Sequence, residues 1–288
     1  MKTISIEICD KSDYKKFAKV YFQSYTSGEF LKKVRLEATI KRFEAEFQND
    51  LSTFYVAKED GEIIGIGSLA TYSGASFISN LGIIPDKQKQ GIGNKLFKRM
   101  LNDALLINPT IEIFARDFAV EKIMKKNGFK EQFITHMLEL DLHDFGKVDY
   151  YKIDFNIDRS DSIPQWIYQF DSKAIGYDRS MLLNYLMSKE ESTIFYYKQR
   201  RERCYAIKNG NRIGPLIATS EKIAFHMITY LILHDANTII VPEHMISKLN
   251  YKFGPITRQN RHYVKMSCGK KRRIKKNWIW GFNSFSYG

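Results

Sequence analysis

The residues in this sequence best suited to chemistry lie between positions 88 and 93. Gln88, Gly91 and Gly93 are spaced as Q-x-x-G-x-G, with the basic Lys89 among them. Glycine has no Cβ atom, so the backbone at Gly91 and Gly93 can approach an anion closely and adopt positive φ angles. The first N–H groups of a following helix, together with the positive end of its dipole, would point at the same anion. The pattern therefore predicts a site for a diphosphate group.

Two predicted elements position this loop. A short apolar strand, Leu81–Ile84, ends at Pro85, and an amphipathic helix follows the glycines. The apolar residues on one face of that helix are Phe97, Met100, Leu101, Ala104 and Leu105. The glycine pattern alone also fits a strand-to-helix turn that binds nothing, and it matches neither the dinucleotide nor the P-loop spacing. Patterns elsewhere in the sequence are needed to distinguish a diphosphate site from a turn that binds nothing.

The first 140 residues predict the element order β-α-α-β-β-β-α-β-α-β. Asp60-Gly61 is a strong hairpin signal between two of the strands. The predicted strands are Ile4–Ile8, Thr53–Ala57, Ile63–Ala70, Ala75–Ile84, Ile111–Ala115 and Phe133–Leu140. The first helix has its apolar face at Tyr14, Phe17, Ala18, Tyr21 and Tyr25, and the second at Leu36, Ile40, Phe43 and Phe47. A short helix, Glu121–Lys126, is expected to end at Asn127-Gly128 in a left-handed cap.

The motif L-x-I-x-P, followed by Q-x-x-G-x-G and an amphipathic helix, resembles the acetyl-CoA pyrophosphate motif of the GNAT superfamily of N-acetyltransferases. Asp117–Phe129 resembles the second signature of that family, a short Asn-led helix that ends in K-x-G-F. The resemblance implies that the backbone at Leu81 and Ile83 pairs with the pantetheine arm of acetyl-CoA. It also implies a coenzyme-binding set of Gln88, Lys89, Gln90, Gly91, Ile92, Gly93, Asn94 and Asp117.

Two positions depart from that family. Many members place a tyrosine four residues before the glycine of the second signature, where its hydroxyl can protonate the leaving thiolate; Met124 stands here and cannot give a proton. Many members also carry a glutamate on the strand before the phosphate loop, whereas Ala75–Ile84 contains no carboxylate. Because the amine must lose a proton during the reaction, the usual set of catalytic groups is incomplete.

The second half of the sequence resembles a degenerate copy of the first half. Thr238–Gly254 repeats the strand, break, short helix and glycine of Thr110–Gly128, but no Q-x-x-G-x-G precedes it. The patterns D-x-x-A-x-G-x-D-R and G-P-x-x-A are similar to those of GNAT domains of the Acetyltransf_18 type. They are carried by Asp171, Ala174, Gly176, Asp178, Arg179, Gly214, Pro215 and Ala218.

We expect a fold of the α/β (α+β) class with two tandem GNAT-like domains, each a mixed, mostly antiparallel sheet flanked by helices. The predicted ranges are 1–143 and 160–288, with 144–159 as a linker.

Asp171 and Asp178 are the candidates for contacts with the amine substrate. A partly desolvated carboxylate can pair with an ammonium group and then accept its proton. The alternative is structural: Asp171 caps a turn before Gly176, and Asp178 forms a local ion pair or cap beside Arg179. The pattern alone slightly favours the structural alternative for each aspartate.

Composition narrows the class of protein. The net charge is +13, and the segment 145–288 contributes +12 of it, with six basic residues between Lys270 and Lys276. Such a run can bind nucleic acid, although it more often forms a solvated loop. The three cysteines are far apart and in no metal-binding spacing, so we expect a reducing compartment and no metal. No signal peptide or spanning segment is predicted, which favours a cytoplasmic protein without a membrane partner.

The sequence therefore predicts an N-acyltransferase that moves the acetyl group of acetyl-CoA to a primary amine by direct attack. Two alternatives stay open. One is an inactive or catalytically weak protein that binds or senses acyl-CoA, and the other is a modifier of a nucleic-acid-associated target that uses the basic segment. The acceptor class also stays open among small amines, amino acids, antibiotics, peptide N-termini and protein lysines, as does the oligomeric state.

Overall fold

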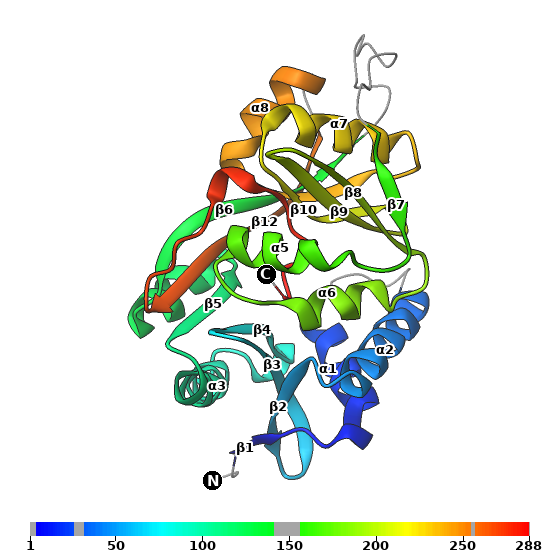
Figure 1. The fold of residues 1–288 in the computed structure, drawn as a ribbon. Coiled ribbons are helices and arrows are strands. Elements are labelled where there is room, and N and C mark those ends of the chain that lie inside the picture. Colours follow the sequence, from blue (N-terminus) through cyan, green and yellow to red (C-terminus); the bar gives the residue numbers. More distant parts are fainter. Residues whose placement is uncertain (1–3, 26–31, 141–155, 255–256, 288) are drawn as a thin grey trace. The chain divides into compact units, whose positions relative to one another are not determined.

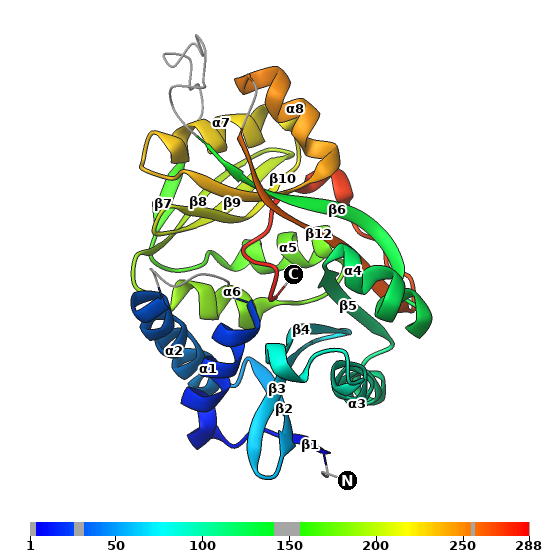
Figure 2. The ribbon, with the colours of Figure 1, turned by 180° about the vertical axis from the view of Figure 1, so that it is seen from behind.

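The computed structural model describes residues 4–25, 32–140, 156–254 and 257–287. The chain divides into two compact units, Met1–Ile113 and Phe114–Gly288, which are described separately (Figures 1 and 2). Both units are mixed α/β structures whose strands are mostly antiparallel. The predicted fold class is thereby confirmed.

The first unit is built on the strands β1 (Ile4–Ile8), β2 (Ser52–Glu59), β3 (Glu62–Tyr72), β4 (Ala75–Ile83) and the start of β5 (Thr110–Ala115), which neighbour one another in this order. All these pairs are antiparallel except β4 with β5. The predicted hairpin is confirmed: Asp60 and Gly61 have φ angles of 52° and 86°. Two consecutive positive φ angles are what a tight two-residue hairpin turn requires.

Three helices complete the first unit: α1 (Tyr14–Tyr25), α2 (Lys32–Gln48) and α3 (Ile92–Ile107). The apolar faces predicted for α1 and α2 meet over β2. Phe17 of α1 lies edge-on to Phe43 and Phe47 of α2 and to Phe54 of β2, with ring centroids 4.9, 5.5 and 5.2 Å away. This aromatic cluster fixes α2 against the sheet.

The second unit begins with a short irregular helical segment, formed by α4 (Asp117–Ala119), a π-helical turn η3 (Val120–Met124) and a 3-10 turn η4 (Lys125–Asn127). Gly128 ends the segment in the predicted left-handed cap, with φ 80°. The remaining helices are α5 (Gln165–Ile175), α6 (Ser180–Met187), α7 (Glu221–Ile232) and α8 (Glu243–Phe253). Helices α7 and α8 lie on one face of the sheet and α5 and α6 on the other (Figures 1 and 2).

The strands of the second unit are β6 (Lys130–Glu139), β7 (Asp158–Ser160), β8 (Ser192–Gln199), β9 (Glu202–Asn209), β10 (Arg212–Ala218), β11 (Thr238–Pro242), β12 (Thr257–Gly269) and β13 (Ile279–Gly281). From β7 to β12 the chain repeats the order β-α-α-β-β-β-α-β-α-β found from β1 to β6. This agrees with the prediction of a second copy.

Strand β6 joins the later part of the chain. It pairs antiparallel with β11 on one side and with β12 on the other, so that Glu139 lies opposite both Thr238 and Thr257. Sequence order alone placed this strand at the end of the first domain. The predicted limits 1–143 and 160–288 stay predictions, and most of the predicted linker lies outside the described residues.

Candidate functional site

One edge of β4 is open beyond its middle. Its parallel pairing with β5 covers Ser76–Ile78, whereas β4 itself continues to Ile83. On the other edge β4 stays paired with β3, and the register shifts between Ile66 and Ser68. Asn80 lies opposite this shift in the left-handed region, with φ 53°. The residues that follow Asn80 therefore present backbone groups that no parallel neighbour occupies.

Leu81 and Ile83 face this open edge. The N–H of Ile84 donates to the carbonyl of Ile64 on β3, and successive residues of a strand alternate between edges. The N–H and C=O groups of Ile83 and Leu81 therefore point away from β3. Side chains already occupy both carbonyls: the Tyr25 hydroxyl donates to Leu81 at 2.5 Å, and the Gln88 amide donates to Ile83 at 3.0 Å. Within the part of the chain that the structure describes, the two N–H groups are left as donors for a ligand at this edge.

The predicted phosphate loop leads directly into α3. Gly91 is the N-cap residue with φ 79°, and no side chain caps the helix. The first backbone bond into the helix runs from Lys95 N–H to the Gly91 carbonyl, so the N–H groups before Lys95 have no intrahelical acceptor. A Cβ atom built on Gly91 would meet nothing within 4 Å, and one on Gly93 would lie 3.4 Å from Ile83. The loop therefore has room for a ligand beside an uncapped helix N-terminus.

The charge around this helix end is positive. No acidic residue lies in the first turn of α3, while Lys89 and Asn94 are exposed beside it. Lys87, in contrast, is held 2.5 Å from Glu59, and the Gln90 amide donates to the Asp86 carbonyl at 3.2 Å. The Gln90 side chain thus stabilises the turn, while Lys89 forms no ion pair with any residue that the structure describes.

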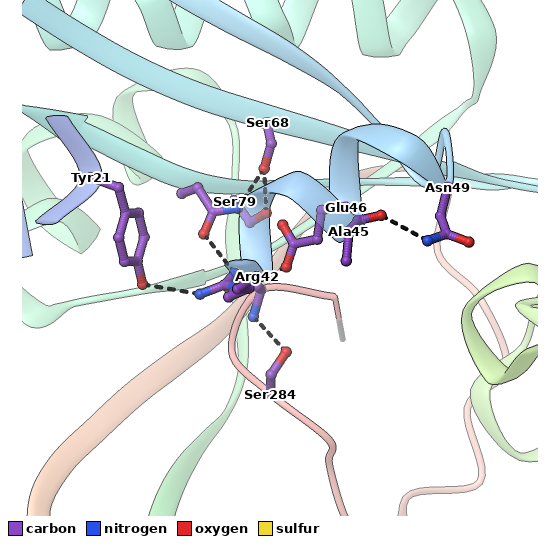
Figure 3. Close-up of polar contacts among 10 residues, drawn as sticks. Tyr21, Arg42, Ala45, Glu46, Asn49, Ser68, Ser79 and Ser284 are labelled. Atoms are coloured by element: carbon purple, nitrogen blue, oxygen red, sulfur yellow. Dashed lines mark hydrogen bonds and ion pairs between the residues drawn. The ribbon is translucent and has the colours of Figure 1, made fainter. Parts of the chain in front are cut away.

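A polar cluster lies behind Asn80, between α2 and the strands β3 and β4. Figure 3 shows Tyr21, Arg42, Glu46, Ser68 and Ser79 gathered in this cluster. The Arg42 guanidinium donates to Glu46 at 2.7 Å and to the Tyr21 hydroxyl at 3.4 Å. The Ser68 and Ser79 hydroxyls are 2.8 Å apart. Sequence reasoning missed this cluster, although Glu46, three residues after Phe43, is a carboxylate on the apolar face of α2.

Asp117, predicted to bind the coenzyme, lies in the second unit at the start of α4. Its side chain is 66% exposed, and its carboxylate lies 2.7 Å from Nε2 of His262 on β12. Met124, at the position where many family members have a tyrosine, is 1% exposed. The second signature is thus folded as a helical segment, with an aspartate that contacts His262 at its start and a buried thioether near its end.

Asp171 is part of a buried ion pair. Arg179 donates to both of its oxygens at 2.8 Å, the Tyr205 hydroxyl donates to one of them, and none of the three side chains is more than 1% exposed. Burial is the largest single influence on the pKa of Arg179 and would lower it, but the charge and hydrogen bonds of Asp171, together with Tyr205 and Tyr177, raise that pKa above its ordinary value. Because Asp171 is enclosed and fully paired, the geometry favours the structural alternative for this residue.

Asp178 is exposed and caps the turn before α6. Its carboxylate accepts a hydrogen bond from the Ser180 N–H at 2.8 Å. This is the local capping role that the sequence offered as its alternative. Asp171 lies within α5 and Asp178 lies in the connection between α5 and α6, and the two aspartates have different partners.

The strand-to-helix connection of the second copy is capped and filled. The Ser220 hydroxyl accepts from the Ile223 N–H at the start of α7. Strand β10 pairs with β11 only at Arg212 and Ile213, and beyond them β13 pairs with β10 at Leu216 and Ile217. The segment 279–281 thus occupies an edge of β10, and the corresponding edge of β4 is open.

Three side chains of the basic run at positions 270–276 make contacts within their own unit. The Arg272 guanidinium donates to the Gly176 carbonyl at 3.1 Å, and the Lys276 ammonium donates to the Gln132 carbonyl at 3.2 Å. The Lys275 ammonium lies 3.9 Å from the centre of the Trp278 ring. These contacts give the three side chains structural roles.

Other features bear on the class of protein. Within the described residues, no group of three or more His, Cys, Asp or Glu side chains is arranged to hold a metal ion. Among the helices that the structure describes, none combines the length and apolar character needed to cross a membrane.

Comparisons with known proteins identify the family. Two family models, both described as an acetyltransferase (GNAT) domain, match residues 50–131 and 167–248. The chain belongs to the GNAT acetyltransferases and carries two such domains. The match at 167–248 is to the Acetyltransf_18 model, as the motifs of the second half indicated.

Solved structures show the same fold over almost the whole chain. A putative acetyltransferase from Pyrococcus horikoshii is 22% identical, with a TM-score of 0.84 over 99% of this chain and 96% of that protein. A tandem GNAT protein of the clavulanic acid biosynthesis pathway is 10% identical, with a TM-score of 0.56 over 93% and 98%. A GCN5-related N-acetyltransferase from Sphaerobacter thermophilus is 11% identical, with a TM-score of 0.59 over 92% and 95%. A search of curated protein sequences finds no match to this chain.

Proposed function

We propose that this protein transfers the acetyl group of acetyl-CoA to a primary amine. The observation that carries the proposal is the pairing of an uncapped, glycine-flanked helix N-terminus with an open strand edge directly before it. Membership of the GNAT family supports an acetyltransferase in general, and the particular donor and acceptor belong to the proposal. The first unit supplies the features that fit the coenzyme.

The diphosphate of acetyl-CoA would be held at the start of α3. The N–H groups of Ile92, Gly93 and Asn94 and the helix dipole would bind its oxygens, and Lys89 would add positive charge. The open space at Gly91 fits this role, because a side chain there would project into the loop. The backbone would thus supply most of the contacts, as a site for a flexible, anionic coenzyme requires.

The reactive end of acetyl-CoA would lie along β4. The N–H groups of Leu81 and Ile83 face the open edge, where one can pair with the pantetheine arm and the other can polarise the thioester carbonyl as an oxyanion hole does. Tyr25 and Gln88, bound to the carbonyls of these residues, would hold the backbone in place. The amine would attack the carbonyl directly, so no covalent enzyme intermediate is needed.

Substitution of the loop glycines tests coenzyme binding. Gly91→Asp adds negative charge and a side chain at a φ of 79°, and Gly93→Glu adds negative charge at the first helical turn. Loss of the dipole contacts and charge repulsion should lower acetyl-CoA affinity by about 100-fold, roughly 2.7 kcal/mol, in titration calorimetry. Lys58→Glu, a charge change on β2, is the control variant. Unchanged affinity in both glycine variants would contradict the proposed site.

A thiol-release assay tests the transfer itself. Wild-type protein with acetyl-CoA would be given alkylamines, amino acids, aminoglycosides, peptides with free N-termini and lysine-bearing proteins. Amine-dependent thiol release, with the acetylated amine found by mass spectrometry, is expected for at least one class.

The buried Met124 favours a second candidate, a protein that binds acyl-CoA without turnover. This side chain cannot protonate a leaving thiolate and is closed to solvent. Tight acetyl-CoA binding with no thiol release across the amine panel would favour this candidate over the transferase. Release that depends on an amine would exclude it.

A further inference from the structure

Glu46 on α2 is a buried carboxylate with one oxygen unused. Its side chain is 1% exposed, and Oε1 accepts from Arg42 at 2.7 Å. Oε2 is closed to solvent and has no hydrogen-bond partner among the residues that the structure describes. Leaving a charged oxygen unpaired in the interior is costly, so such an atom calls for an explanation in a water, a ligand or a catalytic role.

Arg42 connects this carboxylate to the open end of β4. Its guanidinium donates to Glu46 and, at 3.5 Å, to the side-chain oxygen of Asn80. The Asn80 amide in turn donates to the Ser68 hydroxyl at 2.8 Å. Asn80 directly precedes Leu81 in β4 and has a left-handed φ of 53°. Glu46 therefore belongs, through Oε1 and Arg42, to a polar network that reaches Asn80, the residue directly before Leu81.

The proposed reaction needs a proton acceptor near this point. An alkylamine is protonated at neutral pH and has to lose a proton before its nitrogen can attack a carbonyl. Strand β4 carries no carboxylate, and the two aspartates of the second unit are engaged as an ion pair and a cap. Among the described residues of the first unit, Glu46 is a buried carboxylate with one oxygen that has no hydrogen-bond partner.

We propose that Glu46 accepts the proton of the acceptor amine through a water molecule bound at Oε2. This inference rests on the proposed function and deepens it, because it names a proton acceptor and limits the acceptor to amines that are protonated when they bind. The water is required because the Arg42 guanidinium lies between Glu46 and Asn80. The Ser68 and Ser79 hydroxyls and the Asn80 amide provide polar partners in the same network (Figure 3).

The proposed reaction balances in protons and electrons without any further reactant. The ammonium group gives one proton through the water to Glu46 and becomes a neutral amine. Its nitrogen lone pair forms the C–N bond to the acetyl carbonyl, and the C–S bond breaks with its electron pair on sulfur. The second proton of the attacking nitrogen goes to the thiolate to give the free thiol. Glu46 then releases its proton to solvent, and the products are the acetamide, the thiol and one proton.

A structural role for Glu46 makes a different prediction. If the carboxylate only pairs with Arg42, removing either partner should weaken folding, and the pH dependence of turnover should not change. If it accepts a proton, Glu46→Gln should remove the carboxylate's contribution to the pH dependence, whereas Arg42→Gln should still show an acidic limb, because the carboxylate is retained. The two roles are therefore separated by the shape of the pH–rate profile rather than by the size of the activity loss.

The experiment compares Glu46→Gln, Glu46→Asp and Arg42→Gln with wild type, and uses Glu37→Gln as the matched control. Glu37 lies on the same helix and is exposed. The assay is thiol release from acetyl-CoA, with the best alkylamine or amino-acid acceptor of the panel and with hydroxylamine, which is neutral near pH 7. The thermal midpoint of unfolding checks that each variant is folded. Calorimetry checks that each variant binds acetyl-CoA.

For the protonated amine, we expect Glu46→Gln to lower kcat by roughly 100-fold and to replace the acidic limb of the wild-type profile with one that follows the titration of the amine itself. With hydroxylamine the loss should stay within about threefold, because no ammonium proton has to be removed. Glu46→Asp should keep the acidic limb with reduced kcat, and Glu37→Gln should match wild type.

An unchanged acidic limb in Glu46→Gln, or equal losses for both nucleophiles, would overturn the role of Glu46 and leave the proposed function standing. Absence of turnover by wild type with every amine would overturn the proposed function, and this inference with it. A crystal structure with acetyl-CoA gives a further readout: a water on Oε2 supports the proposal, and a protein donor on Oε2 overturns it.

Discussion

The two strand-to-helix connections of this protein, β4 to α3 and β10 to α7, have the same place in their repeats and opposite properties. In the first, the strand edge beyond Ile78 is open, and α3 begins at a glycine without a side-chain cap. In the second, β13 pairs with the corresponding part of β10, and Ser220 caps α7. A helix N-terminus can bind an anion only while its N–H groups are free. The comparison indicates how a coenzyme-binding arrangement can be converted into a structural one.

The filling of the second connection is specific. The Phe282 N–H donates to the Ile240 carbonyl at 2.8 Å, next to the pairs that join β13 to β10. A Cβ atom on Gly214 would lie 2.2 Å from the Phe282 carbonyl oxygen, so this segment can approach β10 closely only because residue 214 is glycine. The G-P pattern that marked the second half in the sequence thus makes room for the C-terminal segment.

The largest effect should come from Trp280→Ala in β13. Trp280 is 1% exposed, and its ring packs edge-on against Phe225 of α7 at 5.4 Å. Removing it leaves a large cavity, so we expect a loss of about 3–5 kcal/mol in the free energy of unfolding, measured by denaturant titration. Acetyl-CoA should still bind with unchanged affinity and one molecule per chain. Tyr251→Ala, at a side chain 90% exposed, is the control.

A loss below 1 kcal/mol for Trp280→Ala would mean that β13 contributes little to the second unit. A second coenzyme bound by the variant would instead show that the filled edge keeps a binding capacity. Either result would break the contrast between the two connections.

A smaller effect is expected for Ser220→Ala. Loss of the capping hydroxyl at α7 should cost about 1 kcal/mol of unfolding free energy, and Ser220→Asn should restore most of it because asparagine also caps well. Thermal and denaturant unfolding measure both variants. A reduced acetyl-CoA affinity in Ser220→Ala would be inconsistent with a purely structural α7 terminus.

The smallest effect is expected for Lys89→Gln. An exposed cation beside the α3 terminus should contribute about 0.3–1 kcal/mol to diphosphate binding, which corresponds to roughly two- to fivefold in affinity and weakens as salt is added. Calorimetry at two ionic strengths measures this effect. Lys98→Gln, farther along the same helix, is the control and should leave affinity unchanged. Equal losses in both variants would indicate a general charge effect in place of a local contact.

Local patterns predicted the elements well. The limits of β1 agree with the sequence, β4 ends one residue before the predicted Ile84, and Gly128 forms the expected cap. These features depend on residues close in sequence, where periodicity and turn chemistry act directly. The uncapped glycine start of α3 was predictable for the same reason.

Features that depend on distant residues were not predictable. Strand β13 fills the edge of β10 through contacts between Leu216 and Gly281, which no local pattern encodes. The burial of Glu46 depends on how α2 packs, and its link to Asn80 passes through Arg42. The structure also engages Asp171 with Arg179 and Tyr205, which sequence spacing left open.

The pairing of β6 with β11 and β12 has a consequence for biosynthesis. Residues 130–139 leave the ribosome long before Thr238–Pro242 and Thr257–Gly269, the two strands that flank them in the finished sheet. Long-range pairing of this kind is slow, because a large loop has to close before any contact compensates for its lost entropy. The nascent strand therefore has two unsatisfied edges during translation of about a hundred residues, a period in which chaperone protection would matter most.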